Sequence, residues 1–70
     1  MNGIQYRYWT EQAGSYLLCR RAVDGGRTEY ATSKKGWTEN ASDHDILKFV
    51  SEDAARNEAG NRGINPADVR

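Results

Sequence analysis

The fold is decided by residues 15–32, which read SYLLCRRAVDGGRTEYAT. The run before the glycines alternates with the period of two that is typical of a strand, and one side of it is formed by Leu17, Cys19 and Val23. The Asp24-Gly25-Gly26 sequence suits a tight hairpin turn, because glycine adopts a positive φ at little cost. We therefore expect antiparallel strands over residues 15–23 and 27–32, with the Leu17 side facing the core.

A further strand is expected upstream, over residues 4–10, where aromatic and polar residues alternate. Gly14 lies in the short connection that follows and can take a positive φ, so the first two strands should form a hairpin. Three strands joined by such short turns make a meander.

The second half of the chain predicts a helix, and two interpretations of its start remain open. In the first, Ser42 caps a long helix that includes residues 46–50. In the second, residues 46–50 form a short fourth strand, and Ser51 caps a helix over residues 52–62. We favour the second, because acidic residues follow Ser51 in the first turn and poor helix formers precede it.

Together these patterns predict a single α+β domain over residues 1–70. Its sheet is a three- or four-stranded antiparallel meander with one C-terminal helix packed on one face, followed by a short tail over residues 64–70. Trp37 follows a polar break and should bury its indole to anchor the loop after it.

Length and composition limit the class of protein. A chain of 70 residues buries only about 60% of its extended surface, so the core must be thin. The formal net charge is zero, which demands neither a nucleic acid nor a membrane as partner. No segment approaches the roughly 20 apolar residues of a membrane span, and no signal peptide is evident. We expect a soluble, cytoplasmic protein without membrane contact.

Titratable residues give weak signals for chemistry. Cys19 is the single cysteine and lies mid-strand, where a core position is expected, and lone His44 cannot assemble a zinc site. Asp43 and Asp45 flank His44, but solvated loop and capping carboxylates explain them better than a metal does. We expect no catalytic residues, no metal and no cofactor, and therefore not an enzyme.

Aromatic and basic residues gather in the first half of the chain. Six of the seven aromatic residues precede position 40. Up to Trp37 the chain has six Lys or Arg residues and only three Asp or Glu residues. The strand over residues 15–23 places an arginine on each face, so at least one should point to solvent. The binding surface that we predict is formed by Trp9, Tyr16, Arg20 and Arg21, a composition typical of interface hot spots. The alternative is an acidic surface on the helix, formed by Glu52, Asp53 and Glu58.

The order of features over residues 16–59 resembles a loose group of small phage and prophage proteins. The matching features are a strand hairpin, Gly36 and Trp37 before a polar loop, a short apolar strand ending in Phe49, and a helix start. That helix start carries Ser51, Glu52 and Ala54. Some compact phage proteins inhibit host machinery, including CRISPR effectors, so the resemblance implies an inhibitor or adaptor. It transfers no functional residue.

The function expected from these observations is that of a non-enzymatic binding protein. It would be a small inhibitor or adaptor from a mobile element, anti-CRISPR-like, that engages a protein of a host complex. The alternative is a small nucleic-acid-binding module that stacks bases on the aromatic, arginine-bearing sheet. Self-association as a homodimer also remains open.

Overall fold

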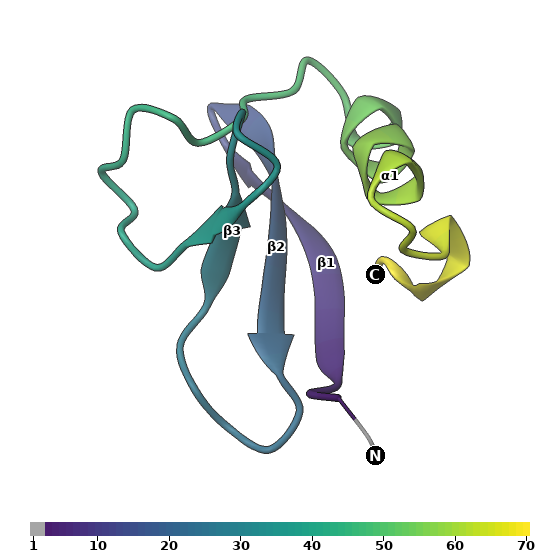
Figure 1. Ribbon diagram of the computed structural model, residues 1–70. Helices are drawn as coiled ribbons and strands as arrows, with labels where there is room; N and C mark the ends of the chain where they lie inside the picture. Colours follow the sequence, from purple (N-terminus) through teal and green to yellow (C-terminus); the bar gives the residue numbers. More distant parts are fainter. Residues whose placement is uncertain (1–2) are drawn as a thin grey trace.

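The computed structural model describes residues 3–70 (Figure 1). A four-stranded antiparallel sheet has the order β1-β2-β3-β4, with α1 and a 3₁₀ turn, η1, after it. The bounds are β1 Tyr6–Ala13, β2 Ser15–Ala22, β3 Glu29–Ala31, β4 Trp37–Thr38, α1 Glu52–Asn61 and η1 Pro66–Asp68. The prediction of an α+β meander with one C-terminal helix is confirmed. None of the helices in residues 3–70 is long and apolar enough to cross a membrane.

The strands differ in length from those expected. β1 and β2 form one long hairpin that turns at Gly14, where φ is 78°. β3 has only three residues. A turn in which the Gly25 N–H donates to the Ala22 carbonyl at 3.1 Å follows β2, and residues 26–28 then reach β3 outside the sheet, so the connection is longer than the tight hairpin turn that we expected. Gly25 and Gly26 in that connection do take positive φ, at 125° and 102°.

The fourth strand is β4, not residues 46–50. The segment over residues 46–50 is extended but touches the sheet at two isolated points, where Ile46 bridges Thr32 and Phe49 bridges Tyr16. Phe49 and Tyr16 exchange two backbone hydrogen bonds, of 2.8 and 2.9 Å. Since the segment crosses from the end of β3 to the start of β2, it cannot pair with either strand as a ladder.

Helix α1 begins and ends as the local pattern predicts. The Ser51 hydroxyl accepts a hydrogen bond of 3.1 Å from the Ala54 N–H, so the long-helix interpretation from Ser42 is wrong. Gly63, with φ of 79°, follows the last turn, and the Ile64 N–H bonds back to the Ala59 carbonyl at 2.9 Å. The tail then forms η1.

The core lies between α1 and the face of the sheet that carries Leu18. Its buried residues are Leu18, Ala31, Ala55, Ala59 and Val69. The prediction that the Leu17 side faces this core is therefore wrong. Cys19, on the Leu17 side, is fully buried, but Val23 is 49% exposed. The two helix alanines have no exposed surface, which lets the helix axis approach β2 closely.

The C-terminal residues lie along the outer edge of β1 (Figure 1). Val69 forms a parallel bridge with Tyr8; the Arg70 N–H donates to the Tyr8 carbonyl at 2.9 Å, and the Thr10 N–H donates to the Arg70 carbonyl at 3.1 Å. The tail thus covers one part of an edge that would otherwise be open.

Candidate binding surface at the edge of the sheet

Arg20, one of the predicted contact residues, is packed within the fold. Its guanidinium carbon lies 4.0 Å from the centre of the Tyr6 ring and 4.4 Å from the Trp37 ring. Its Nε donates to Glu29 Oε1 at 2.8 Å, and the side chain is 19% exposed. Arg20 shares the sheet face of Leu18, because residues two apart on a strand point the same way. Its role is to join β1, β2, β3 and β4, and we remove it from the candidate surface.

Arg62 joins the helix to the β3–β4 turn, and no sequence pattern indicated this. Its guanidinium donates to the Glu58 carboxylate at 2.7 Å and to the carbonyls of Gly36 and Thr32 at 2.9 and 2.6 Å. The side chain is only 7% exposed, so a charge is buried with three satisfied bonds. Trp37 lies in the same assembly, 5.2 Å from the Arg62 guanidinium, and is half-buried rather than fully buried.

The opposite face of the β1–β2 hairpin carries two arginines side by side. Arg7 is the direct partner of Arg21 in the register, and Trp9 is the next residue of β1 on that face. Arg7 and Arg21 are exposed, and neither forms an ion pair within residues 3–70. The Arg21 Nε donates a hydrogen bond of 2.9 Å to the Gly26 carbonyl, which leaves its charge without a carboxylate partner. Like charges placed directly opposite one another in a sheet are destabilising. An anionic group bound between them would remove this repulsion.

An open hollow of about 880 Å³ surrounds the β1 edge at this point, and we call it the β1-edge hollow. The side chains that give it its character are Tyr6, Tyr8, Trp9, Arg7, Arg21 and Arg70. Asp68 supplies the single carboxylate side chain of its lining. The hollow therefore combines aromatic surface with an excess of positive charge, although the chain as a whole is neutral.

Exposed apolar residues border the β1-edge hollow. Val23 lines it and also lines a smaller adjoining hollow with Ile4. Ile4 is 67% exposed and Val23 is 49% exposed. The result is a continuous surface in which apolar, aromatic and arginine side chains adjoin, as they do at the centres of protein interfaces.

Of the four residues predicted for the binding surface, the hollow brings together Trp9 and Arg21 and leaves out Arg20 and Tyr16. Tyr16 lies at the far end of β2, tied to Phe49. Arg7 and Arg70 were missed. The strand alternation that puts Arg7 on the face of Trp9 was the signal for Arg7, whereas no local pattern places Arg70 beside β1.

Two of the three residues of the alternative acidic surface on α1, Glu52 and Glu58, form ion pairs within the chain. Glu58 is bound to Arg62, whose hydrogen bond holds the pKa of that carboxyl below its ordinary value of 4.5. Glu52 pairs with Arg56 one turn along the helix. Asp53 is exposed and forms no ion pair within residues 3–70. A single carboxylate is a poor basis for a binding surface.

Cys19 is unsuited to nucleophilic chemistry. Its side chain has no exposed surface, and its Sγ lies 3.9 Å from Glu11 Oε2. Burial, followed by the charge of Glu11, raises the pKa of the thiol to about 12. Cys19 therefore stays protonated at neutral pH, whereas a reactive cysteine needs its thiolate.

The carboxylates of Asp43 and Asp45 both form contacts within the chain. Asp43 Oδ1 accepts a hydrogen bond of 2.8 Å from the Asp45 N–H, and Asp45 pairs with Lys34 at 3.5 Å. Across residues 3–70, no three His, Cys, Asp or Glu side chains come close enough together to hold a metal ion.

Comparison of the chain with protein-family models, with curated proteins and with solved structures finds no match. The physical character of the β1-edge hollow is thus the basis on which a function is inferred.

Proposed function

We propose that this chain is a non-enzymatic binding protein that engages a protein partner through the β1-edge hollow. The observation that carries the proposal is the pair of exposed arginines, Arg7 and Arg21, which lie directly opposite one another beside Trp9 and have no carboxylate partner within residues 3–70. An arrangement that costs free energy in the isolated chain is explained when a partner supplies the neutralising group.

The surroundings of the arginines favour a protein over a small anion. Ile4 and Val23 offer exposed apolar surface next to the charged centre, and tyrosines line the edge itself. Protein interfaces combine such an aromatic and arginine centre with apolar contact and a polar rim. A small anion would need only the charge.

The biological role that we propose is that of an inhibitor or adaptor of a host complex, as the resemblance to small phage proteins implies. Cys19 is buried and protonated, and the carboxylates of Asp43 and Asp45 form contacts within the chain, so contact is the action that this chain's residues support best. A domain of this size acts most simply by occupying a surface of its target.

A nucleic acid is the second candidate for the same hollow. Trp9, Tyr8 and Tyr6 could stack bases, and Arg7, Arg21 and Arg70 could contact phosphates. The neutral charge of the chain and the presence of Asp68 in the hollow favour a protein. Salt separates the two, because phosphate contacts release counterions and weaken steeply as salt rises.

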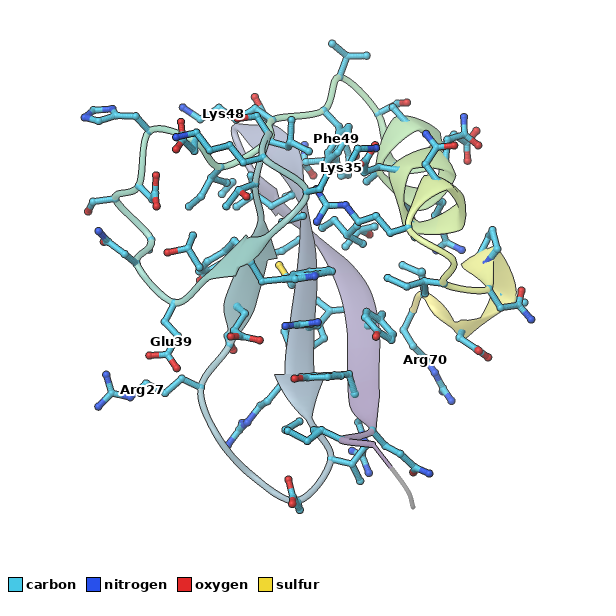
Figure 2. All side chains as sticks on the ribbon, viewed as in Figure 1. Arg27, Lys35, Glu39, Lys48, Phe49 and Arg70 are labelled. Atoms are coloured by element: carbon cyan, nitrogen blue, oxygen red, sulfur yellow. The ribbon has the colours of Figure 1, made fainter. Side chains whose placement is uncertain are left out.

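The test is affinity capture from a lysate of the source organism with matched charge variants. The double variant Arg7→Gln/Arg21→Gln should lose the partner that the unmodified chain captures. Arg27→Gln/Lys48→Gln is the control, since it also removes two exposed positive charges that form no ion pair within residues 3–70. Figure 2 shows Arg27 and Lys48 well away from Arg70 and its side of the sheet.

Loss of the partner with both double variants, or with neither, contradicts the proposal. A captured partner that is a protein, survives nuclease treatment and stays bound at high salt supports it. A captured nucleic acid, released by modest salt, assigns the hollow to the second candidate.

A further inference from the structure

We infer that the partner presents an extended acidic segment, which adds to the free part of the β1 edge as a strand while its carboxylates contact the arginines of the β1-edge hollow. The inference rests on the proposed function and specifies the partner's chemistry. It follows from the register of β1, the path of the C-terminal tail and the charge of the hollow.

The register leaves the backbone of Tyr6 facing away from β2. In an antiparallel pair, residues that exchange hydrogen bonds alternate with residues that do not. The Val23 N–H donates to the Gln5 carbonyl, so the neighbouring pair, Tyr6 and Ala22, is of the second kind. No backbone hydrogen bond from elsewhere in residues 3–70 reaches Tyr6. Its N–H and C=O are therefore free for a further strand.

The same edge already accepts an added strand two residues further on. Tyr8 and Thr10, which have the same outward orientation as Tyr6, pair with Arg70 of the tail. Before that point the tail turns through η1 and leaves the edge, so Ala67 and Asp68 line the hollow instead of pairing with β1. The free part of the edge thus lies inside the hollow.

The positive charge of the β1-edge hollow favours an added strand that carries acidic side chains. Arg7, on the edge strand β1, and Arg21, on the neighbouring strand β2, lie on one face of the sheet. Successive side chains of an added strand point to opposite faces. A segment with carboxylates at alternate positions would set them all on the face of Arg7 and Arg21. Each carboxylate could accept the paired N–H bonds that an arginine offers.

Other occupants fit less well. A nucleic acid has no regular series of backbone donors and acceptors with which to pair with Tyr6. A second copy of this chain, pairing through the same edge, would bring Arg7, Arg21 and Arg70 close to their own counterparts. An acidic polypeptide strand satisfies both the backbone and the charges.

The probe is a short fluorescent peptide of alternating Glu and Val, with an alternating Lys and Val peptide as its control. Fluorescence anisotropy should show binding of the Glu peptide alone. Arg7→Gln/Arg21→Gln should weaken it by about tenfold or more, because two charge-assisted contacts are lost. Arg27→Gln/Lys48→Gln should leave the affinity unchanged. Equal affinity in both double variants would overturn the inference.

Strand addition is tested by N-methylation of the same peptide, which removes backbone donors without changing charge. One peptide is methylated at every Val nitrogen and another at every Glu nitrogen. One of the two should fail to bind, because only one set of N–H groups faces β1. In NMR spectra, the Tyr6 amide should become protected from exchange when the unmethylated peptide binds. Equal binding of all three peptides would mean that the arginines act alone and would refute strand addition.

The two proposals fail differently. If the lysate partner depends on Arg7 and Arg21 but the Glu peptide does not bind, the partner's segment is not of this kind and the proposed function stands. If an oligothymidylate binds the hollow and the Glu peptide does not, both the inference and the protein partner are wrong.

Discussion

Replacement of Arg62, the residue that caps the C-terminus of α1, by alanine should destabilise the fold more than replacement of any charged residue within α1. The change removes three hydrogen bonds and leaves the Glu58 carboxylate, 16% exposed, without its partner. Breaking a buried pair by deleting one member costs about 3–5 kcal/mol. In a domain of this size, 1 kcal/mol corresponds to a shift of roughly 4–8 °C in Tm, so Tm should fall by more than about 10 °C.

The assays are thermal unfolding, which gives Tm, and urea unfolding, which gives the free energy, both followed by tryptophan fluorescence because Trp37 lies against Arg62. Arg56→Ala is the matched control, because Arg56 forms the same kind of pair one turn along the helix, with Glu52, at an exposed position. Such surface pairs contribute only about 0.3–0.5 kcal/mol. The variant Arg62→Met/Glu58→Gln should recover part of the loss, since no unpaired charge remains buried.

A loss for Arg62→Ala within about 1 kcal/mol of that for Arg56→Ala would refute the reasoning. It would mean that water replaces the guanidinium at the Gly36 and Thr32 carbonyls without cost. The helix would then be held to the sheet by its alanine face alone.

Four further results are expected. Ser51→Ala should cost about 1 kcal/mol in unfolding free energy through loss of the helix cap, whereas Ser42→Ala should cost almost nothing; the reverse order would contradict the helix start. Trp37→Ala should cost about 2–3 kcal/mol by thermal unfolding, less than a fully buried tryptophan, and a Tm equal to that of the unmodified chain would argue against the Arg20 stack. The native pKa of Glu58 lies below 4.5, so its contribution to the free energy of unfolding is present above that pH and is lost as pH falls through the lowered value. Glu58→Gln should therefore reduce the dependence of unfolding free energy on pH in the acid range. An unchanged dependence would disprove the pairing with Arg62. Cys19 should resist a thiol reagent at pH 8 until urea unfolds the chain, and rapid labelling of the folded protein would show that the thiol is accessible.

Local chemistry allowed much of the fold to be predicted. The cap at Ser51, the stop at Gly63 and the positive φ of Gly25 and Gly26 depend on neighbouring residues only, and the structure bears out each of them. The tight hairpin turn expected at those glycines is wrong, because β2 and β3 pair further from the turn. The face of β2 that meets the helix could not be read in the same way, because Leu17 and Leu18 are adjacent and equally apolar. Which one enters the core depends on where the helix packs.

For the candidate surface too, the features that depend on neighbouring residues could be predicted, whereas those that depend on distant contacts could not. The alternation of β2 required an outward arginine, and Arg21 is exposed as that argument demands. The choice between Arg20 and Arg21 followed from the position of Trp37 in β4, which gives Arg20 a ring on each side. Arg62 contacts residues 26 and 30 positions earlier, and no pattern of neighbouring residues encodes a contact over that separation.

The pairing of Val69 with Tyr8 has a consequence for the order of folding. The contacts of the meander join strands that are close in sequence, whereas this bridge closes a loop of about 60 residues, nearly the whole chain. Loop closure costs entropy that is recovered only when the contact forms. The tail should therefore dock last when the chain folds and separate first when it opens locally, and this partly opened form presents the β1 edge from Tyr6 to Thr10 without interruption.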